Sequence, residues 1–324
     1  MENIAAFLIS LISGLIIGKI LIPKLRDLKA SQTERKVLES HQKKSGTPTM
    51  GGAIFLIALL IGSIWNIPAI EALGLQAHPL IAPVLILTIG FGLIGFADDY
   101  LKVVKRRTDG LYPWQKMLLQ IVVTTVFAVY LIEYSPVDLL MRVPFGNGAY
   151  IDLGWLSIPL LYFAVIGTVN GTNFTDGLDG LATGVTVIVT IFFTIASRMT
   201  DGGVEPLGMA MLGGLVAFFV YNRYPAKVFM GDTGSLALGG FVAGMAYVMR
   251  LPLFIPIVGI IYLVEVVSVI LQVGSFKLRH GKRIFRMAPI HHHFELGGWS
   301  ETKVVSVFTF VTLIAMIVGM IALM

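Results

Sequence analysis

The stretch Asn170-Gly-Thr-Asn-Phe-Thr-Asp-Gly-Leu-Asp-Gly180 is a polar segment between two apolar ones, 156–169 and 181–196. It brings together amides, hydroxyls, carboxylates and glycines. A charge at the centre of a bilayer costs about 2.5–3.5 kcal/mol on insertion scales. We therefore expect a loop at the membrane edge and a functional site, with Asp176 and Asp179 on one side of a helical turn. The alternative is a polar turn that only connects two spans.

The composition is typical of an integral membrane protein. Of the 324 residues, 56% are hydrophobic and only 13% are charged, and the mean hydropathy is +0.84, whereas soluble domains carry about 25% charged residues. The absence of cysteine excludes a disulfide framework and a zinc–thiolate site. The first apolar stretch has no basic region before it and no small-residue cleavage site, so we expect a retained span rather than a signal peptide.

Apolar segments of about 20 residues, the length that crosses a bilayer as a helix, predict an all-α fold with ten transmembrane helices. We expect them to form a single transmembrane domain over residues 1–324. A short hairpin is predicted where 141–145 and 149–153 flank the turn signal Gly146-Asn-Gly148. The expected spans cover residues 4–23, 50–67, 79–97, 116–134, 156–170, 180–198, 207–222, 234–250, 253–274 and 303–323.

Lysine and arginine predict the orientation, because cytoplasmic loops carry an excess of them. Most of the 24 Lys and Arg residues fall in the loops after the first, third, seventh and ninth spans, whereas the opposite loops hold only Arg142, Arg198 and Arg250. We therefore expect both termini and the hairpin on the extracytoplasmic side. The clustered acids then fall at cytoplasmic helix ends, so any chemistry is expected on the cytoplasmic face.

Asp98 and Asp99 end the third span. Adjacent helical residues point about 100° apart, so the two cannot both face one ligand squarely. Two carboxylates 4 Å apart still repel by up to about 4 kcal/mol at an effective dielectric of 20. A divalent cation or a raised pKa would relieve that repulsion. The alternative is a solvated helix end.

Phe229-Met-Gly-Asp-Thr-Gly-Ser235 opens the eighth span. We expect Asp232 to cap this helix, and Gly231 and Gly234 to leave backbone amides free for a phosphate. A cap without a ligand is the alternative. Because the acids of several loops offer only oxygen ligands, the metal they suit is Mg²⁺ or Mn²⁺.

Pro289-Ile-His-His-His-Phe-Glu295 lies in the last cytoplasmic loop, beside Lys282, Arg283 and Arg286. Consecutive histidines cannot all turn toward one ion, so hydrogen bonds to phosphate or carboxylate fit better than a metal site. A histidine-rich surface loop without function is the alternative.

His41-Gln-Lys-Lys-Ser-Gly-Thr-Pro-Thr-Met-Gly-Gly52 leads into the second span. Lys43 and Lys44 beside glycines and hydroxyls suit an anionic ligand, although anchoring at the cytoplasmic face explains two lysines equally well. Acids for Mg²⁺, basic residues for phosphates and glycines for close approach together suggest phosphoryl transfer at the bilayer surface. Such catalysis is mostly positioning and charge neutralisation.

These motifs resemble, in matching order from about residue 41 to 303, the phospho-N-acetylmuramoyl-pentapeptide transferase family within the polyprenyl-phosphate sugar-phosphate transferases. The wider superfamily shares the acidic motifs, whereas the first and last strings point to the muramoyl branch. The matching strings are Ser45-Gly-Thr-Pro-Thr-Met-Gly-Gly52, Ala97-Asp-Asp-Tyr100, Asn173-Phe-Thr-Asp-Gly-Leu-Asp-Gly180, Phe229-Met-Gly-Asp-Thr-Gly-Ser235 and Ala288-Pro-Ile-His-His-His-Phe-Glu295.

The resemblance implies an enzyme of the bacterial inner membrane that moves phospho-N-acetylmuramoyl-pentapeptide from its UDP-linked precursor to undecaprenyl phosphate. UMP is released and Mg²⁺ is the implied cofactor. The implied partners are these two substrates, the lipid bilayer and a second copy in a homodimer, with no nucleic acid. A bend in the ninth helix is also implied, and Pro252 and Pro256 are compatible with it.

Matching the family's motifs also assigns roles to residues. Asp232 would bind the metal, and Phe229 would stack on uracil. The implied catalytic residues are Asp98, Asp99, Asp232 and His291. The implied substrate-binding residues are Lys44, Thr49, Lys116, Asn173, Asp176, Gly177, Asp179, Asn222, Phe229, His292 and His293.

We expect a single displacement in which Asp98 removes any residual proton from the lipid phosphate. The second pKa of a phosphate is about 6, so little deprotonation is needed, and this favours direct attack over a phosphorylated aspartate. The alternatives are another polyprenyl-phosphate sugar-1-phosphate transferase or an ion-coupled transporter that uses Glu265 and Glu133. Transporters place such acids near the bilayer midplane and carry internal repeats, which this sequence does not indicate.

Overall fold

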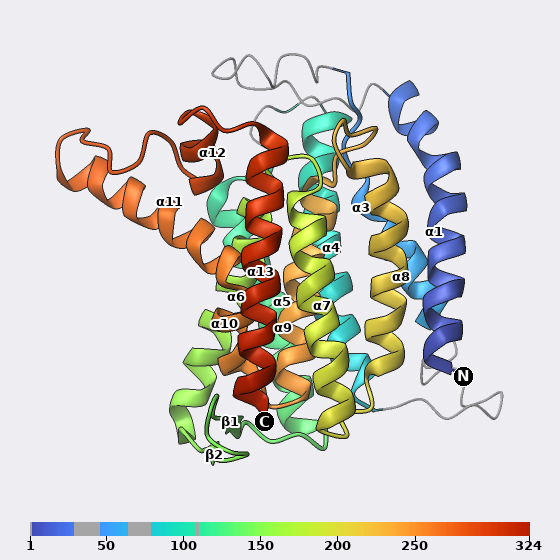
Figure 1. Cartoon of the computed structure of the whole chain (residues 1–324), viewed down its shortest axis with the longest axis vertical. Coiled ribbons are helices and arrows are strands. Elements are labelled where there is room, and N and C mark those ends of the chain that lie inside the picture. Colours follow the sequence, from blue (N-terminus) through green and yellow to red (C-terminus); the bar gives the residue numbers. More distant parts are fainter. Residues whose placement is uncertain (1, 29–45, 64–78, 106, 108–109) are drawn as a thin grey trace.

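The computed structural model describes residues 2–28, 46–63, 79–105, 107 and 110–324. Lys44 and the first part of its motif lie outside the described residues. The described chain is a bundle of long, roughly aligned helices (Figure 1). Its helices are α1 (Glu2–Asp27), α3 (Gly52–Ser63), α4 (Ile81–Val103), α5 (Pro113–Glu133), α6 (Ser157–Thr175), α7 (Leu181–Met199), α8 (Glu205–Asn222), α9 (Gly231–Val248), α10 (Ile255–Val258), α11 (Ile260–Leu278), α12 (Ile290–Glu295) and α13 (Glu301–Leu323).

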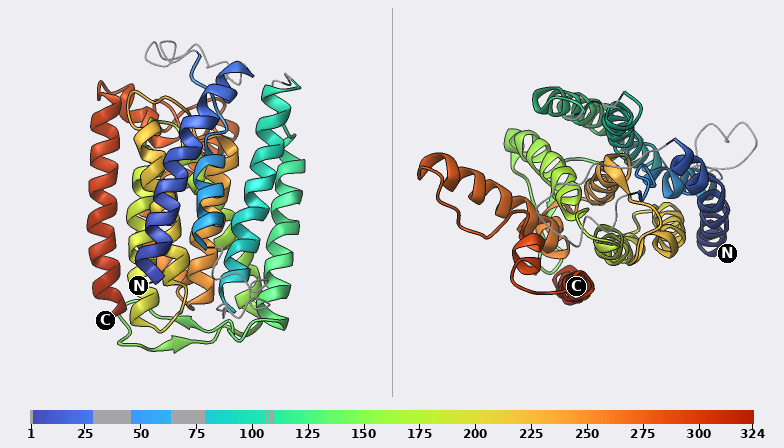
Figure 2. Two further views of the ribbon diagram at one scale, coloured as in Figure 1. Left: turned by 90° about the vertical axis from the view of Figure 1, so that its right-hand side faces the viewer. Right: turned by 90° about the horizontal axis from the view of Figure 1, so that it is seen from above.

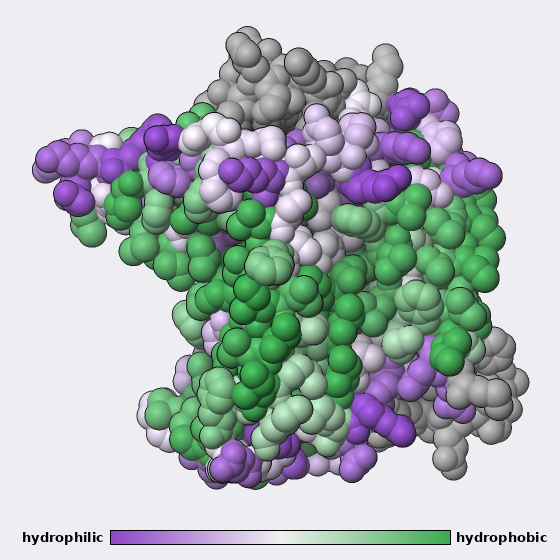
Figure 3. All heavy atoms as spheres, viewed as in Figure 1, coloured by the Kyte–Doolittle hydropathy of each residue, from purple (hydrophilic) through white to green (hydrophobic). Residues whose placement is uncertain are grey.

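The predicted class, a helical protein with several membrane spans, is confirmed. Within the described residues, eight helices are long and apolar enough to cross a membrane: α1, α4, α5, α6, α7, α8, α11 and α13. The apolar side chains form a belt between two polar ends (Figure 3). The apolar helix α3 is shorter, and α9 is not among the eight. The count of ten therefore stays a prediction.

Helix α9 is the centre of the bundle, because every one of its residues except Asp232 is buried. Glycines allow its close packing. A Cβ on Gly95 of α4 would overlap the carbonyl oxygen of Asp232, and one on Gly52 of α3 would overlap the backbone of Gly234. Small residues at such contacts let membrane helices approach backbone to backbone. This packing places the end of α4 against the first turn of α9.

Gly95→Ala is expected to destabilise the protein, because the added methyl group meets backbone rather than a movable side chain. Overpacking of this kind typically costs about 1–3 kcal/mol. The matched control is Gly274→Ala in α11, where an added Cβ meets nothing within 4 Å. Thermal unfolding in detergent should show a lower midpoint for Gly95→Ala alone. Equal midpoints for the two variants would contradict this account of the contact between α4 and α9.

The two ends of the bundle carry different features (Figures 1 and 2). One end holds the start of α1, the end of α13 and two short strands, β1 (Met141–Arg142) and β2 (Tyr150–Ile151). The strands pair antiparallel, with Met141 opposite Ile151. The other end holds the end of α4, the start of α9 and α12. After α9, Pro252 begins a short 3-10 helix (Pro252–Phe254) and Pro256 lies in the short helix α10. Helix α11 then leaves the bundle at an angle (Figure 1).

Candidate active site

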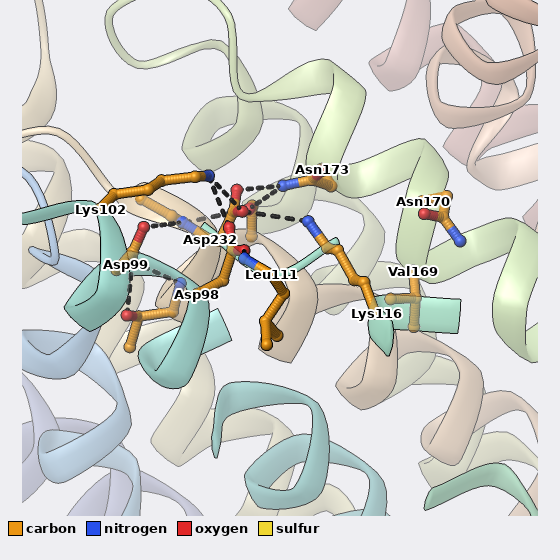
Figure 4. A network of polar contacts seen from close by, with 12 residues as sticks. Asp98, Asp99, Lys102, Leu111, Lys116, Val169, Asn170, Asn173 and Asp232 are labelled. Carbon is orange, nitrogen blue, oxygen red and sulfur yellow. Dashed lines mark hydrogen bonds and ion pairs between the residues drawn. The ribbon is translucent and has the colours of Figure 1, made fainter. Parts of the chain in front are cut away.

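A lysine–carboxylate network forms where α4, α5, α6 and α9 meet (Figure 4). Its centre is Asp232, in the first turn of α9. Lys102 Nζ and Lys116 Nζ each donate to Asp232 Oδ2 at 3.0 Å, and Asn173 Nδ2 donates to Oδ1 at 2.8 Å. The Asp232 side chain is 15% exposed. One partly accessible carboxylate thus gathers two ammonium groups and an amide.

Asp98 belongs to the same network. Lys102, one turn further along α4, forms an ion pair with Asp98 as well as with Asp232. The backbone N–H of Leu111 donates to Asp98 Oδ1 at 2.7 Å. Asp98 and Asp232 therefore both lie within reach of the Lys102 ammonium group. Such carboxylates attract a cation, and the ammonium group attracts a phosphate.

Asp99 points elsewhere, as the angle between adjacent helical residues predicts. Its carboxylate accepts the backbone N–H groups of Asp232 at 3.2 Å and Thr233 at 2.9 Å, and the Thr233 hydroxyl at 2.6 Å. Asp99 is completely buried. The prediction that Asp232 caps α9 is therefore wrong. A side chain of α4 satisfies these amides instead, and this leaves the Asp232 carboxylate free for the network.

The polar stretch 170–180 is only partly a loop, contrary to the prediction. Helix α6 continues to Thr175, and the turn is confined to 176–180. The polar side chains of the helical part find hydrogen-bond partners on α9. Thr172 Oγ1 donates to the Ser235 carbonyl at 2.8 Å, and Asn173 donates to Ser235 Oγ at 2.8 Å. Asn173 thereby reaches the network from a helix.

Asp176 follows directly after α6, next to the network. Loss of solvent around its carboxylate, and then repulsion from Asp232 and Asp99, raise the pKa of Asp176 well above its usual range. A carboxyl group that resists ionisation beside other acids is typical of a functional site.

Asp179 and Asn222 hold the loop that leads into α9. Asp179 Oδ2 accepts the backbone N–H of Ala226 at 2.9 Å. Asn222 accepts the Thr183 hydroxyl at 2.8 Å and donates to the Val228 carbonyl at 3.1 Å. These contacts give both residues a role in positioning the loop, and their predicted contacts with substrate stay predictions.

Phe229 and Thr49 lie beside the start of α9. The backbone of Phe229 pairs with the segment before α3, donating to Pro48 and accepting from Gly51, both at 2.8 Å. Phe229 as a whole residue is partly exposed, which is compatible with a stacking surface. Thr49 is buried, its Oγ1 has no hydrogen-bond partner among the described residues, and it packs against Gly231.

The three histidines have three different partners, as the geometry of consecutive residues predicts. His291 Nδ1 lies 3.0 Å from Glu265 Oε1, and His292 Nδ1 lies 2.8 Å from Glu295 Oε2. His293 Nδ1 accepts the backbone N–H of Arg286 at 3.1 Å. Of the three, His291 is placed against Gly177, where an added Cβ would overlap its Nε2. The histidine loop and the acidic turn therefore meet at that point.

Two functional candidates were missed by the sequence interpretation. Lys102 carries a detectable signal, because it lies four residues after Asp98 on one helix and such residues share a face. From the sequence, Glu265 fits only the transporter alternative, whereas in the structure its carboxylate contacts His291 and Ile290. That pairing needs no transported ion, and it offers the transporter alternative no support.

The residues present fit Mg²⁺ bound together with substrate phosphates. No group of three or more His, Cys, Asp or Glu side chains in the described part of the chain could hold a metal by itself. Mg²⁺ rarely needs such a cage, since it is usually held by one or two carboxylates, water and phosphate oxygens. Asp232 and Asp98, which both pair with Lys102, supply two such carboxylates.

Comparison with known proteins identifies the family. Residues 81–250 match the model of glycosyl transferase family 4, and residues 44–56 match signature 1 of the phospho-N-acetylmuramoyl-pentapeptide transferases. A relative of that name from Acetivibrio thermocellus is 49% identical, over 99% of this chain and 95% of its own. Those from Clostridium novyi and Clostridium perfringens are 45% and 46% identical, over 99% and 96% of this chain and 96% and 95% of their own. The chain thus belongs to the phospho-N-acetylmuramoyl-pentapeptide-transferase family, and it is a membrane-embedded phospho-sugar transferase.

Proposed function

We propose that this protein transfers phospho-N-acetylmuramoyl-pentapeptide from its UDP-linked precursor to undecaprenyl phosphate, with release of UMP and dependence on Mg²⁺. The observation that carries the proposal is the convergence of Lys102 and Lys116 on Asp232, beside Asp98 and Asn173 (Figure 4). Full-length similarity to phospho-N-acetylmuramoyl-pentapeptide transferases supports the choice of the transferred group.

The proposed reaction is a single displacement. A phosphate oxygen of the lipid attacks the β-phosphorus, an O–P bond forms, and the bond from that phosphorus to the bridging oxygen breaks, so UMP leaves with the bridging oxygen. Lys102 and Lys116 would bind the diphosphate, and Asp98 would accept any residual proton of the lipid phosphate. Asp232 would hold Mg²⁺, which when bound supplies charge neutralisation at the diphosphate.

The other residues would position the reaction. Asp99 holds the first turn of α9 and hence Asp232. Phe229 would stack on uracil, and Asp176 and Gly177 would border the nucleotide. The same proposal gives Thr49, Lys44, Asp179, Asn222, His292 and His293 contacts with the substrate, and His291 a place at the sugar and peptide end.

The proposal also includes the setting of the enzyme. The whole chain would act as a single transmembrane domain with ten spans in the bacterial plasma membrane, as a homodimer. The network lies at the end of the bundle opposite the chain termini and the β1–β2 hairpin (Figure 1). With the lysine and arginine bias of the sequence, this supports a cytoplasmic site and extracytoplasmic termini and hairpin.

UMP release by the purified protein tests the proposal. With UDP-N-acetylmuramoyl-pentapeptide, undecaprenyl phosphate and Mg²⁺, we expect sustained UMP formation that stops when EDTA removes the metal. UDP-N-acetylglucosamine should not replace the precursor. Omitting the lipid should abolish UMP release entirely if the displacement is direct. A stoichiometric burst of UMP without lipid would instead indicate a phosphorylated aspartate, and activity in EDTA would overturn the metal requirement.

A further inference from the structure

Glu265 is a completely buried acid in the membrane-spanning helix α11. A buried carboxylate is unfavourable unless hydrogen bonds satisfy it. Both of its oxygens have partners on the histidine loop: Oε2 accepts the backbone N–H of Ile290 at 2.9 Å, and Oε1 lies 3.0 Å from His291 Nδ1. The acid therefore connects α11 to the start of α12.

With an ionised Glu265 carboxylate, these contacts select one tautomer of His291. An ionised carboxylate can only accept hydrogen bonds, so the ring must carry a proton on Nδ1. In the neutral ring, Nε2 then has a free lone pair. His291 is 1% exposed, and its Nε2 has no hydrogen-bond partner among the described residues. A buried polar atom without a partner requires an explanation, and a bound ligand is one.

The unpartnered nitrogen faces the acidic turn. Nε2 packs directly against Gly177, the residue after Asp176, and only a residue without a side chain leaves it this space. His292 and His293 differ in this respect. His292 pairs with Glu295 within its own short helix, and His293 binds the backbone of Arg286. Of these three rings, His291 is the one that a spanning helix holds against the turn.

We propose that Glu265 is a positioning residue that holds His291 in the Nδ1–H tautomer, so that Nε2 is presented beside Gly177 to accept a hydrogen bond from the bound substrate. This inference rests on the proposed function. A carboxylate behind a histidine commonly fixes the ring and its tautomer in this way, and removing it typically costs activity by about 10–100-fold. The alternative is that Glu265 only attaches α12 to α11.

The first test is the tautomer itself, measured by ¹⁵N NMR of the full-length protein labelled at histidine, without substrate. The His291 signals are assigned by their loss in His291→Gln. We expect Nδ1 protonated and Nε2 unprotonated in the unmodified protein. In Glu265→Gln, the single amide oxygen is needed by Ile290 N–H, so the NH₂ group faces Nδ1 and the proton moves to Nε2. Protonation on Nε2 in the unmodified protein would overturn the inference, whether or not the variant folds.

The second test separates positioning from attachment by steady-state UMP release. For Glu265→Gln we expect kcat to fall by about 10- to 30-fold, within the range above, with KM for the UDP-linked precursor little changed and the unfolding midpoint retained. Ser268→Ala is the control, because Ser268 is buried one turn away and, among the described residues, its hydroxyl donates only to the Glu265 carbonyl, at 2.7 Å. Its kcat should stay unchanged.

A double variant tests whether Glu265 acts through His291. If Glu265 acts through His291, adding Glu265→Gln to His291→Gln should cause no further loss, because residues that act as a unit are not additive. The same fold-loss in both backgrounds, or a normal kcat in Glu265→Gln, would overturn the proposal. If the unmodified protein released no UMP, the proposed function would fail while the NMR spectra would still decide the tautomer.

Discussion

Asp232→Asn is expected to lower kcat for UMP release by at least about 1,000-fold, because losing one preorganised electrostatic contact already costs about 10²–10³ in enzymes. The substitution keeps the size of the side chain and its contact with Asn173, but it removes the charge opposite Lys102 and Lys116. An amide is also a poor ligand for Mg²⁺ compared with a carboxylate. The lost charge and the weaker binding of Mg²⁺ both act at the diphosphate, where the reaction takes place.

The fold should survive this substitution, because the backbone N–H of Asp232 stays bound to Asp99. Thermal unfolding checks this directly. The matched control is Asp138→Asn, which removes a carboxylate paired with Arg250 at the opposite end of the bundle. An exposed ion pair contributes about 0–1 kcal/mol, so the control should remain stable and active. Near-normal turnover by Asp232→Asn would exclude Asp232 as the metal ligand.

The membrane class and the gathering of the acids at one end of the bundle could be predicted because both depend on strong local signals. Apolar runs of spanning length are visible one by one, and charged residues collect where those runs end. The distribution of lysine and arginine then placed Asp98, Asp176 and Asp232 on one side. The structure brings these three acids to one end of the bundle.

The local structure at the site could not be predicted, because tertiary hydrogen bonds replaced the local ones. The residues Asn170–Thr175 have the composition of a loop, yet they continue α6, since Thr172 and Asn173 bind α9. Likewise, Asp232 has the position of a helix cap, yet Asp99 supplies that function from another helix. A single sequence without its fold cannot indicate which of two acids binds a backbone and which faces a ligand.

The partners of Glu265 could not be predicted from the sequence either. As an acid inside an apolar run, Glu265 fits only the alternative of an ion-coupled transporter, since the sequence alone does not indicate what lies next to it. Its partners are 25 and 26 residues away on the histidine loop. The motif His291-His-His293 was recognised, but the residue that orients its first member lies outside every motif.

Lys116→Met is expected to change metal binding and turnover in opposite directions. Without substrate, the Lys116 ammonium lies 3.0 Å from Asp232 Oδ2, where a cation would compete with it. Removing it should tighten Mn²⁺ binding, measured by electron paramagnetic resonance, by about tenfold, or about 1.4 kcal/mol. This is less than the roughly 4 kcal/mol of a unit charge pair 4 Å apart at an effective dielectric of 20, because Lys102 remains.

Turnover of Lys116→Met should nevertheless fall by about 100-fold. Once the metal has displaced the Lys116 ammonium group from Asp232, that group is available to neutralise the charge of the diphosphate in the transition state. Lys303→Met is the control: it removes the same charge from the first turn of α13, where Lys303 lies over the Trp299 ring at 4.4 Å, and should alter neither property. If Lys116→Met instead weakened Mn²⁺ binding together with turnover, the ammonium would not compete with the metal, and the cation would have to bind away from Asp232. Tighter Mn²⁺ binding with slower turnover in Lys116→Met, and no change of either in Lys303→Met, would locate the metal, the lysine and the diphosphate at the same carboxylate.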